Sequence, residues 1–215
     1  MKRSALVAGA TGLIGRHLLD RLLEDPAYTE VHALTRRELG RSHPRLRSIA
    51  TDLRNLTALG PSLGAQDVYC CLGTTLRVAG SRAAFEDVDY RMVVELARAS
   101  LAAGAQQFLV ISAMGASTVS PSFYSRVKGR MEAAVSALGF DAVHILRPSL
   151  LLGERAEKRP AEDLAQKLSP YLTPLFAGPL ARYRPIAASE VAEAMLGLAL
   201  RGQPGAHVHH LPLAD

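Results

Sequence analysis

The chain has 215 residues, of which 48% are hydrophobic and 21% charged, and its formal net charge at pH 7 is +5. This composition is typical of a globular domain and excludes a disordered or low-complexity chain. The apolar runs fall short of the ~18 residues of a membrane helix. The arginines are scattered without aromatic partners, which argues against a nucleic-acid surface. We therefore expect one cytoplasmic domain over residues 1–215, without membrane or nucleic-acid partners and with no indication of its oligomeric state.

The predicted elements alternate between strands and helices. An apolar strand at 5–8 leads into a glycine-rich turn, and a helix with leucines at helical spacing follows until Asp25-Pro26. Further strands are expected at 31–35, 46–50, 67–72, 107–112 and 140–146, with a short helix or turn at 55–60 and helices over 81–103 and 122–138. This alternation predicts an α/β fold, namely a single Rossmann-type doubly wound parallel sheet with helices on both faces.

The pattern changes after Leu151, where charged residues and prolines become frequent. The composition of residues 153–185 predicts a flap on the substrate side of the sheet, with a helix at 161–168. A closing helix at 191–200 and a last strand at 207–211 follow. Because this tail is too short for a separate domain, we assign it to the same nucleotide-binding domain.

The glycine-rich turn is the first candidate binding feature. A strand, a glycine-rich turn and a helix in this order form a cradle for the phosphates of a dinucleotide. In such a turn Gly9 allows the tight bend, Gly12 lets the backbone approach the pyrophosphate, and Gly15 lets the helix lie close to the sheet. The expected cofactor-binding residues of this turn are Gly9, Ala10, Thr11, Gly12, Leu13, Ile14 and Gly15.

The end of the second strand distinguishes the two nicotinamide dinucleotides. NAD sites place an Asp or Glu there, whereas NADP sites place an Arg near the 2′-phosphate. Arg36 and Arg37 follow this strand, and arginine binds phosphate through paired hydrogen bonds. The sequence therefore favours NADP over NAD, with two solvated arginines as the alternative. Asp52 and Leu53, after the third strand, are placed to meet the adenine, unless Asp52 only caps the following turn.

Tyr124 and Lys128 form a candidate catalytic pair. Residues four apart lie on one face of a helix, and a nearby ammonium favours the phenolate form of a tyrosine, which suits acid/base chemistry. The same lysine can hold the nicotinamide ribose. Ser112 ends the fifth strand, where its hydroxyl is placed to donate to a substrate carbonyl oxygen. This spacing of Tyr and Lys also occurs by chance on surface helices, so their position after the fifth strand carries the prediction.

Ligands of parallel sheets bind at the carboxyl ends of the strands. The remaining strand ends supply further expected cofactor contacts: Leu72, Gly73, Thr74, Thr75, Arg147, Pro148 and Ser149. Cys70 and Cys71 are adjacent and are expected to be buried thiols at the edge of the sheet. His207, His209 and His210 have no nearby carboxylate or cysteine to complete a metal site, so we expect no metal.

These segments together resemble the short-chain dehydrogenase/reductase superfamily, in particular its compact atypical branch with the Tat-interacting oxidoreductase-like and epimerase-like proteins. The matching segments are 9–15, 34–37, 71–75, 111–116, 124–128 and 146–155. The resemblance implies a Rossmann fold, a nicotinamide cofactor and a Ser–Tyr–Lys site, with Pro148 and Ser149 beside the nicotinamide amide. Two features depart from the usual pattern: Ala113 follows Ser112 where many members have a second hydroxyl, and Asp89 stands near the place of a helix asparagine.

The sequence thus predicts an NADP-dependent oxidoreductase that transfers a hydride between nicotinamide and a small carbonyl or alcohol substrate. The missing second hydroxyl leaves open a non-catalytic NADP(H)-binding module for regulation or protein interaction. A further alternative is an epimerase or dehydratase of nucleotide sugars, a class that usually carries a larger C-terminal substrate domain than the residues after Ser149 provide. The identity of the substrate is not indicated.

Overall fold

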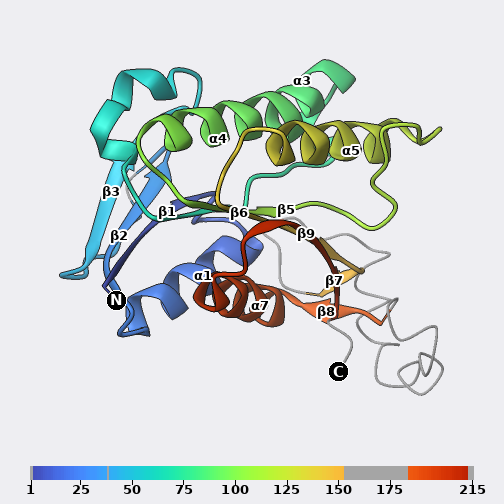
Figure 1. Ribbon diagram of the computed structural model, residues 1–215. Coiled ribbons are helices and arrows are strands. Elements are labelled where there is room, and N and C mark those ends of the chain that lie inside the picture. The colour runs from blue at the N-terminus through green and yellow to red at the C-terminus, as the bar shows by residue number, and fades with distance from the viewer. Residues whose placement is uncertain (1, 38, 153–183, 213–215) are drawn as a thin grey trace.

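The computed structural model describes residues 2–37, 39–152 and 184–212. Its centre is a seven-stranded sheet in which all neighbouring strands run parallel, in the order β3-β2-β1-β4-β5-β6-β9 (Figure 1). The strands are β1 (Arg3–Ala8), β2 (Tyr28–Thr35), β3 (Leu46–Ala50), β4 (Asp67–Cys70), β5 (Gln107–Ile111), β6 (Ala142–Pro148) and β9 (Gly205–Leu211). The predicted fold class is confirmed. The expected helix at 161–168 and all but the last two residues of the expected flap lie outside the described residues.

Helices cover both faces of the sheet (Figure 1). One face carries α1 (Leu13–Glu24) and α7 (Ala188–Arg201), and the other carries η1 (Leu56–Leu63), α4 (Met92–Ala102) and α5 (Phe123–Ser136). Side chains alternate between the two layers along a strand, so Ala5 and Val7 join one core cluster while Leu6 and Ala8 join the other. Burial on both faces explains why the strands read as continuous apolar runs.

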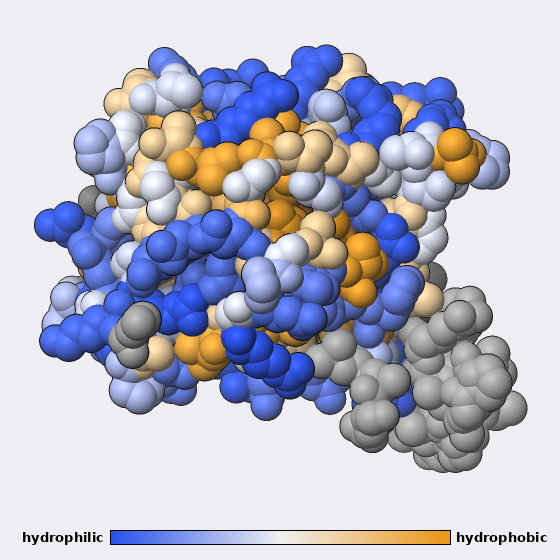
Figure 2. Space-filling view, viewed as in Figure 1, coloured by the Kyte–Doolittle hydropathy of each residue, from blue (hydrophilic) through white to orange (hydrophobic). Residues whose placement is uncertain are grey.

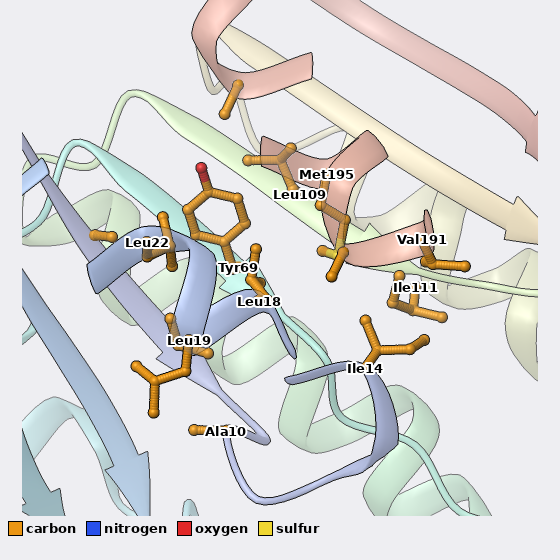
Figure 3. Close-up of a cluster of buried hydrophobic side chains, with 14 of the residues drawn as sticks. Ala10, Ile14, Leu18, Leu19, Leu22, Tyr69, Leu109, Ile111, Val191 and Met195 are labelled. Atoms are coloured by element: carbon orange, nitrogen blue, oxygen red, sulfur yellow. The ribbon is translucent and has the colours of Figure 1, made fainter. Parts of the chain in front are cut away.

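The core on the α1 side is built from two helices that pack against the middle strands of the sheet. Figure 3 shows Leu18 and Leu22 of α1 and Met195 of α7 gathered against Tyr69 of β4 and Leu109 of β5. All five side chains are buried. On the face seen in Figure 2, apolar side chains lie along the middle of the molecule, between the two helix layers, and hydrophilic side chains cover the outer helices.

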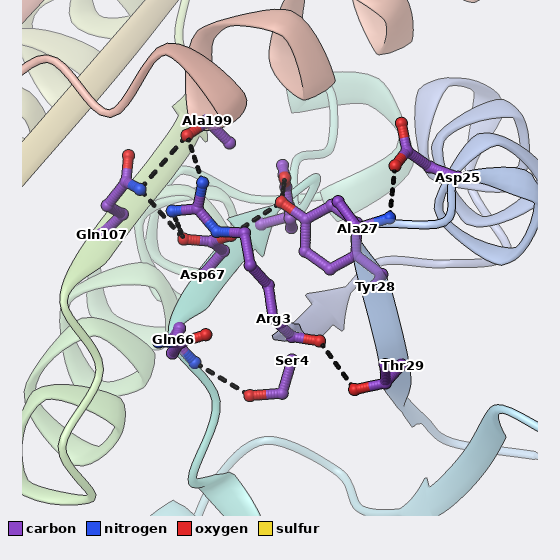
Figure 4. A network of polar contacts seen from close by, with 11 residues as sticks. Arg3, Ser4, Asp25, Ala27, Tyr28, Thr29, Gln66, Asp67, Gln107 and Ala199 are labelled. Atoms are coloured by element: carbon purple, nitrogen blue, oxygen red, sulfur yellow. Dashed lines mark hydrogen bonds and ion pairs between the residues drawn. The ribbon is translucent and has the colours of Figure 1, made fainter. Parts of the chain in front are cut away.

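A buried polar network ties the amino ends of the strands together (Figure 4). The Asp67 carboxylate of β4 accepts hydrogen bonds from Arg3 of β1 (3.0 Å), Tyr28 of β2 (2.6 Å) and Gln107 of β5 (3.1 Å). Arg3 and Gln107 also donate to the carbonyl oxygen of Ala199 in α7, at 3.0 and 3.2 Å. Burial raises the pKa of Asp67, although Tyr28 and Arg3 act in the opposite direction. The network lies at the end of the sheet opposite the carboxyl ends of the strands. It holds β1, β2, β4, β5 and α7 together.

The segment expected as one long helix over 81–103 is divided in the structure. It consists of α3 (Arg82–Glu86), the π-helical turn η2 (Asp87–Arg91) and α4. A π turn inserts an extra residue into the helical repeat, so the apolar spacing that predicted a continuous helix does not reveal it. Thr75, at a predicted strand end, also caps a short helix that was not predicted, α2 (Leu76–Ala79), by accepting from the Val78 backbone N–H.

The last described elements are a small second sheet, helix α7 and the outermost strand of the main sheet, β9. Strands β7 (Leu151–Leu152) and β8 (Ile186–Ala187) pair in a separate two-stranded sheet. Helix α7 begins at Ala188, three residues before the predicted start, because the Glu190 carboxylate accepts the Ala187 backbone N–H and stabilises the first turn. The predicted last strand is confirmed as β9, beside β6. Within the described ranges, no helix is long and apolar enough to cross a bilayer.

Candidate active site

A cavity of about 640 Å³ opens at the carboxyl ends of the central strands. Its walls come from the glycine-rich turn, the residues after β4 and β5, the first turns of α5, and the residues after β6. The expected site residues that line it are Thr11, Gly12, Leu13, Ile14, Leu72, Gly73, Thr74, Thr75, Ser112, Tyr124, Lys128, Pro148 and Ser149. The structure therefore brings both halves of the predicted site to one cavity.

The glycine-rich turn has the shape of a phosphate cradle. Gly9 has φ +83°, and a Cβ there would lie 2.7 Å from the Cys71 carbonyl oxygen. A Cβ at Gly15 would collide with the Gly9 carbonyl group, which shows how closely α1 begins to the turn. Gly12 is the N-cap of α1, with no side-chain cap and no acidic residue in the first turn. The helix N-terminus is thus open to an anion, so these residues fit the pyrophosphate of a dinucleotide.

The expected cofactor contacts after β2 and β3 lie away from the cavity wall. Arg36 and Arg37 are exposed beyond the end of β2. Asp52 accepts the Arg54 backbone N–H at 3.0 Å, which is the turn-capping alternative. Leu53 has φ +65° and is buried in the core. Gly9, Ala10 and Gly15 do not line the cavity either, since they form the back of the turn.

Lys128 is held by a buried carboxylate that the sequence did not identify as its partner. Its ammonium lies 2.8 Å from Asp89 Oδ1 and donates to the Ile111 carbonyl oxygen at 3.2 Å. Both side chains are at least 96% buried. Burial alone would lower the pKa of Lys128, but the charge of Asp89, together with Tyr124, raises it above its ordinary value. The lysine is therefore a fixed cation on the wall of the cavity.

The π-helical turn explains how Asp89 reaches this position. Asp89 is the middle residue of η2, and its second oxygen accepts the Thr74 backbone N–H at 2.8 Å. One carboxylate thus connects the residues after β4 with α5. A π turn within a helix is frequent at functional sites, and here it turns an acidic residue inward from a helix that otherwise presents apolar side chains to the core.

Tyr124 lies one turn before Lys128 on α5. Ser122 caps this helix by accepting the Ser125 backbone N–H, and the ring of Phe85 lies 5.4 Å from the Tyr124 ring, centroid to centroid. A Cβ at Gly129 would collide with the backbone of Ser117, so α5 lies against the loop that precedes it. These contacts hold the tyrosine at the cavity wall.

Ser112 is the third expected catalytic residue, and its hydroxyl already has a partner. It donates to Glu132 Oε1 at 2.5 Å, and both residues are buried. Arg147 donates from Nε to the same oxygen at 2.9 Å and from Nη2 to Glu132 Oε2 at 2.5 Å. The Arg147 side chain therefore differs from the expectation of a cofactor contact: it does not line the cavity, because Glu132 and the Ala116 carbonyl oxygen bind it.

Glu132 is a site residue that sequence reasoning missed. Tyr124, Lys128 and Glu132 recur at every fourth position of α5, so they follow one face of the helix. A polar residue four positions after the lysine, on the face turned toward the sheet, was the available signal. Its partner on β6 depends on tertiary packing and has no local signal.

Two cysteines and a group of histidines were also singled out in the sequence. Cys70 and Cys71 are free thiols, and burial raises the pKa of Cys70 to about 12. Cys70 is the last residue of β4, and Cys71 follows it at the carboxyl edge of the sheet. Cys70 is buried as expected, whereas Cys71 is only partly buried and lines the cavity. His207 stacks on His144, and His209 lies within hydrogen-bonding distance of it, at 3.1 Å. No group of side chains among the described residues has the arrangement of a metal site.

The sheet, the glycine cradle and the Ser, Tyr and Lys around one cavity define an atypical short-chain dehydrogenase/reductase that binds NAD(P). Comparison with known families agrees, since the model described as NAD(P)H-binding matches residues 9–170. The chain belongs to this NAD(P)H-binding family. A member from Emericella nidulans, protein fmp52, mitochondrial, is 37% identical over 178 residues, which cover 77% of this chain and 74% of that protein. Protein HTATIP2 from Rattus norvegicus is 36% identical over 169 residues, which cover 77% and 69%.

Solved structures show the same fold in larger enzymes. MoeE5 in complex with UDP-glucuronic acid and NAD has a TM-score of 0.71 at 21% identity, over 96% of this chain and 75% of that chain. The dTDP-glucose 4,6-dehydratase DesIV from Streptomyces venezuelae, with NAD bound, has a TM-score of 0.72 at 19% identity, over 97% and 75%. At this level of identity the likeness establishes the Rossmann-like fold.

Proposed function

We propose that the chain is an NADP-dependent oxidoreductase that interconverts a small carbonyl compound and the corresponding alcohol. The observation that carries the proposal is that Ser112, Tyr124 and Lys128 line the same cavity as the glycine cradle. A nicotinamide dinucleotide, when bound, supplies or accepts the hydride. The chain's own residues then have to hold the substrate oxygen and move one proton.

Tyr124 is the group proposed to move that proton. Its position on the cavity wall allows the phenol to donate to a substrate oxygen during reduction and to accept the proton during oxidation. Lys128 stands one helical turn away as a cation fixed by Asp89. An ammonium in this place stabilises the phenolate left after donation, and it also offers a donor to a ribose hydroxyl.

The preference for NADP rests on the end of β2. Arg36 and Arg37 are exposed directly after this strand, where a 2′-phosphate is read in dinucleotide-binding folds. No Asp or Glu occurs between Leu34 and Arg37 to hold ribose hydroxyls in the manner of NAD sites. Arginine binds a phosphate through paired, charge-assisted hydrogen bonds, which supports NADP as the cofactor.

The proposal is tested by Tyr124→Phe, with Tyr90→Phe as the matched control. Tyr90 lies in η2 beneath the Arg130 guanidinium and does not line the cavity. The assay follows NADPH oxidation with a panel of aldehydes and ketones. Turnover should fall about a hundredfold or more in the first variant and stay unchanged in the control, while both retain NADPH affinity. Full turnover in Tyr124→Phe would remove the tyrosine from the mechanism.

A second candidate function is favoured by one specific observation. The Ser112 proton is engaged by Glu132, so the serine does not offer the substrate contact expected of an active enzyme of this class. This supports a non-catalytic NADP(H)-binding module for regulation or protein interaction. Tight NADPH binding without oxidation by any member of the carbonyl panel would favour this candidate. The alternative of an epimerase or dehydratase of nucleotide sugars is supported only by the similarity of fold.

The cytoplasmic location expected from the sequence gains no support from the relatives. The proteins from Emericella nidulans and Candida albicans are named mitochondrial. We propose that this chain functions in a reducing compartment, consistent with the free thiols of Cys70 and Cys71. Fractionation of cells that express the native chain would locate it.

A further inference from the structure

The contact between Ser112 and Glu132 fixes the direction of one hydrogen bond. Ser112 Oγ lies 2.5 Å from Glu132 Oε1, and the two residues are 96% and 94% buried. An ionised carboxylate only accepts hydrogen bonds, whereas a hydroxyl has a single proton to donate. The proton of Ser112 therefore lies on the side of Glu132, and the remaining lone pairs of Oγ face the other way.

Arg147 forms an ion pair with Glu132. The guanidinium contacts both carboxylate oxygens, at 2.9 and 2.5 Å, in the two-point geometry that gives strong charge-assisted hydrogen bonds. The hydrogen bonds that Arg147 donates to Glu132 raise the pKa of Arg147. The same guanidinium donates to the Ala116 carbonyl oxygen at 3.0 Å. The Arg147 guanidinium of β6 is thus fixed between Glu132 on α5 and the loop before α5.

We propose that Glu132 is a positioning residue that holds the hydroxyl proton of Ser112, so that the serine presents its oxygen lone pairs and not its proton to the cavity. Ser112 lines the cavity beside Tyr124 and Lys128. An oxygen that only accepts binds a ligand group that donates. A ligand hydroxyl group opposite Ser112 can donate a hydrogen bond to its oxygen. A carbonyl oxygen at the same point finds no donor and is repelled by the serine lone pairs.

This assignment reverses the role expected for Ser112 from the sequence, which was donation to a carbonyl. The consequence for the ligand rests on the proposed function: of the two forms of the substrate, the alcohol gains a hydrogen bond from Ser112 and the carbonyl form does not. Proton transfer stays with Tyr124. Glu132 acts through the serine and does not touch the ligand, since it is not part of the cavity wall.

The orientation is tested without turnover by proton NMR. A hydroxyl proton in a short hydrogen bond to a carboxylate should resonate downfield of the backbone amides. We expect such a resonance in the wild type and in the control Glu86→Gln, whose carboxylate pairs with Arg130 on the surface. It should be lost in Ser112→Ala and in the double variant Glu132→Met/Arg147→Met, which removes both charges together and so avoids a buried unpaired arginine. A resonance that is absent from the wild type, or that survives Ser112→Ala, overturns the proposal.

The consequence for the ligand is tested by measuring how each form of the substrate binds to the cofactor form with which it cannot react. Ser112→Ala should weaken binding of the alcohol form to the NADPH complex about tenfold and change binding of the carbonyl form to the NADP⁺ complex by less than about threefold. The double variant keeps the lone pairs of Ser112 and frees its proton, so it should bind the alcohol form more tightly than Ser112→Ala does and the carbonyl form more tightly than the wild type does. A larger loss for the carbonyl form overturns the assignment. A wild type that turns over no carbonyl compound contradicts the proposed function, and the resonance still decides the orientation of Ser112.

Discussion

The Lys128 ammonium and the Asp89 carboxylate lie 2.8 Å apart in a place where each is almost completely buried. Two opposite charges in such surroundings depend on each other, because either one alone would lose its solvation without compensation. The pair also joins α5 to the π-helical turn η2 beside the candidate cofactor site. It therefore couples the stability of the domain to the geometry of the cavity.

Asp89→Asn should lower both stability and NADPH affinity. Removal of one partner from a buried ion pair costs about 3–5 kcal/mol, which a urea unfolding curve would register. Asp87→Asn is the matched control, because Asp87 lies in the same turn and pairs with Arg54 at the surface. The double variant Asp89→Asn/Lys128→Met should recover much of the stability but not the turnover. Equal stability of Asp89→Asn and the control would show that the pair has no structural role.

The network around Asp67 should dominate the stability of the sheet frame. Asp67→Ala leaves the donors of Arg3, Tyr28 and Gln107 without their shared acceptor. We expect a loss of about 3–5 kcal/mol in the free energy of unfolding, measured by chemical denaturation. Glu193→Gln removes an exposed ion pair with Arg21 and should change little. Because the network is remote from the cavity, the folded fraction of Asp67→Ala should bind NADPH with unchanged affinity.

The stability of the domain should fall at acid pH because of His144. Burial, and then the neighbouring His209 and His207, lower the pKa of His144 from 6.5 to about 4. Between these values the unfolded chain takes up a proton that the folded chain excludes, so the contribution is complete above about pH 6.5 and is lost as the pH falls toward 4. The loss amounts to about 3 kcal/mol for this residue.

Urea midpoints at pH 7.5 and 4.5 would measure this dependence. His144→Gln should flatten it, whereas His43→Gln should keep the wild-type slope, since His43 lies in the loop before β3 and apart from the histidine cluster. An unchanged slope in His144→Gln would assign the acid sensitivity to other groups.

The arginines after β2 should decide the choice of dinucleotide. Arg36→Ala and Arg37→Ala should weaken NADPH about tenfold or more in at least one case and leave NADH affinity unchanged, because only NADPH carries the 2′-phosphate. Arg47→Ala, on β3 and paired with Glu30, serves as the control. Fluorescence titrations with both cofactors provide the measurement. Equal loss for NADH and NADPH would contradict a phosphate contact.

The glycine cradle should not tolerate a single methyl group at Gly15. A Cβ there collides with the Gly9 carbonyl group, so Gly15→Ala must shift α1 or the turn and should abolish NADPH binding at concentrations that saturate the wild type. At Gly197 in α7 a Cβ meets no atom within 4 Å, so Gly197→Ala should keep binding and gain up to about 1 kcal/mol of stability. Normal binding by Gly15→Ala would show that the turn relaxes readily.

Local patterns were sufficient for the sheet and for many of the residues on the cavity wall. Each strand is a short apolar run bounded by turn residues, and the carboxyl ends of parallel strands meet at one edge, so Gly12, Thr74, Ser112 and Ser149 could be placed together from the sequence. Asp89 could not be placed, because the π turn that directs it inward leaves the apolar spacing of its helix almost unchanged.

Long-range partners were the other gap in the prediction. Arg147 looked like a cofactor ligand from its place at a strand end, yet its direction is decided by Glu132 on a helix 15 residues earlier. The spacing of Tyr124, Lys128 and Glu132 gave a hint, but whether a polar residue on a helix faces solvent or the sheet depends on how the helix packs. The direction in which the Ser112 hydroxyl donates its hydrogen bond depends in turn on how Glu132 is placed.

The carbonyl oxygen of Ala199 accepts from Arg3 and from Gln107, which are 196 and 92 positions earlier. During synthesis the first strand therefore leaves the ribosome long before its last hydrogen-bond acceptor exists. Until α7 emerges, the apolar face that it shares with α1 stays open, and the guanidinium of Arg3 lacks one of its buried partners. The nascent chain consequently has to be protected against aggregation until α7 has been synthesised, and the domain completes its folding only after this helix has left the exit tunnel.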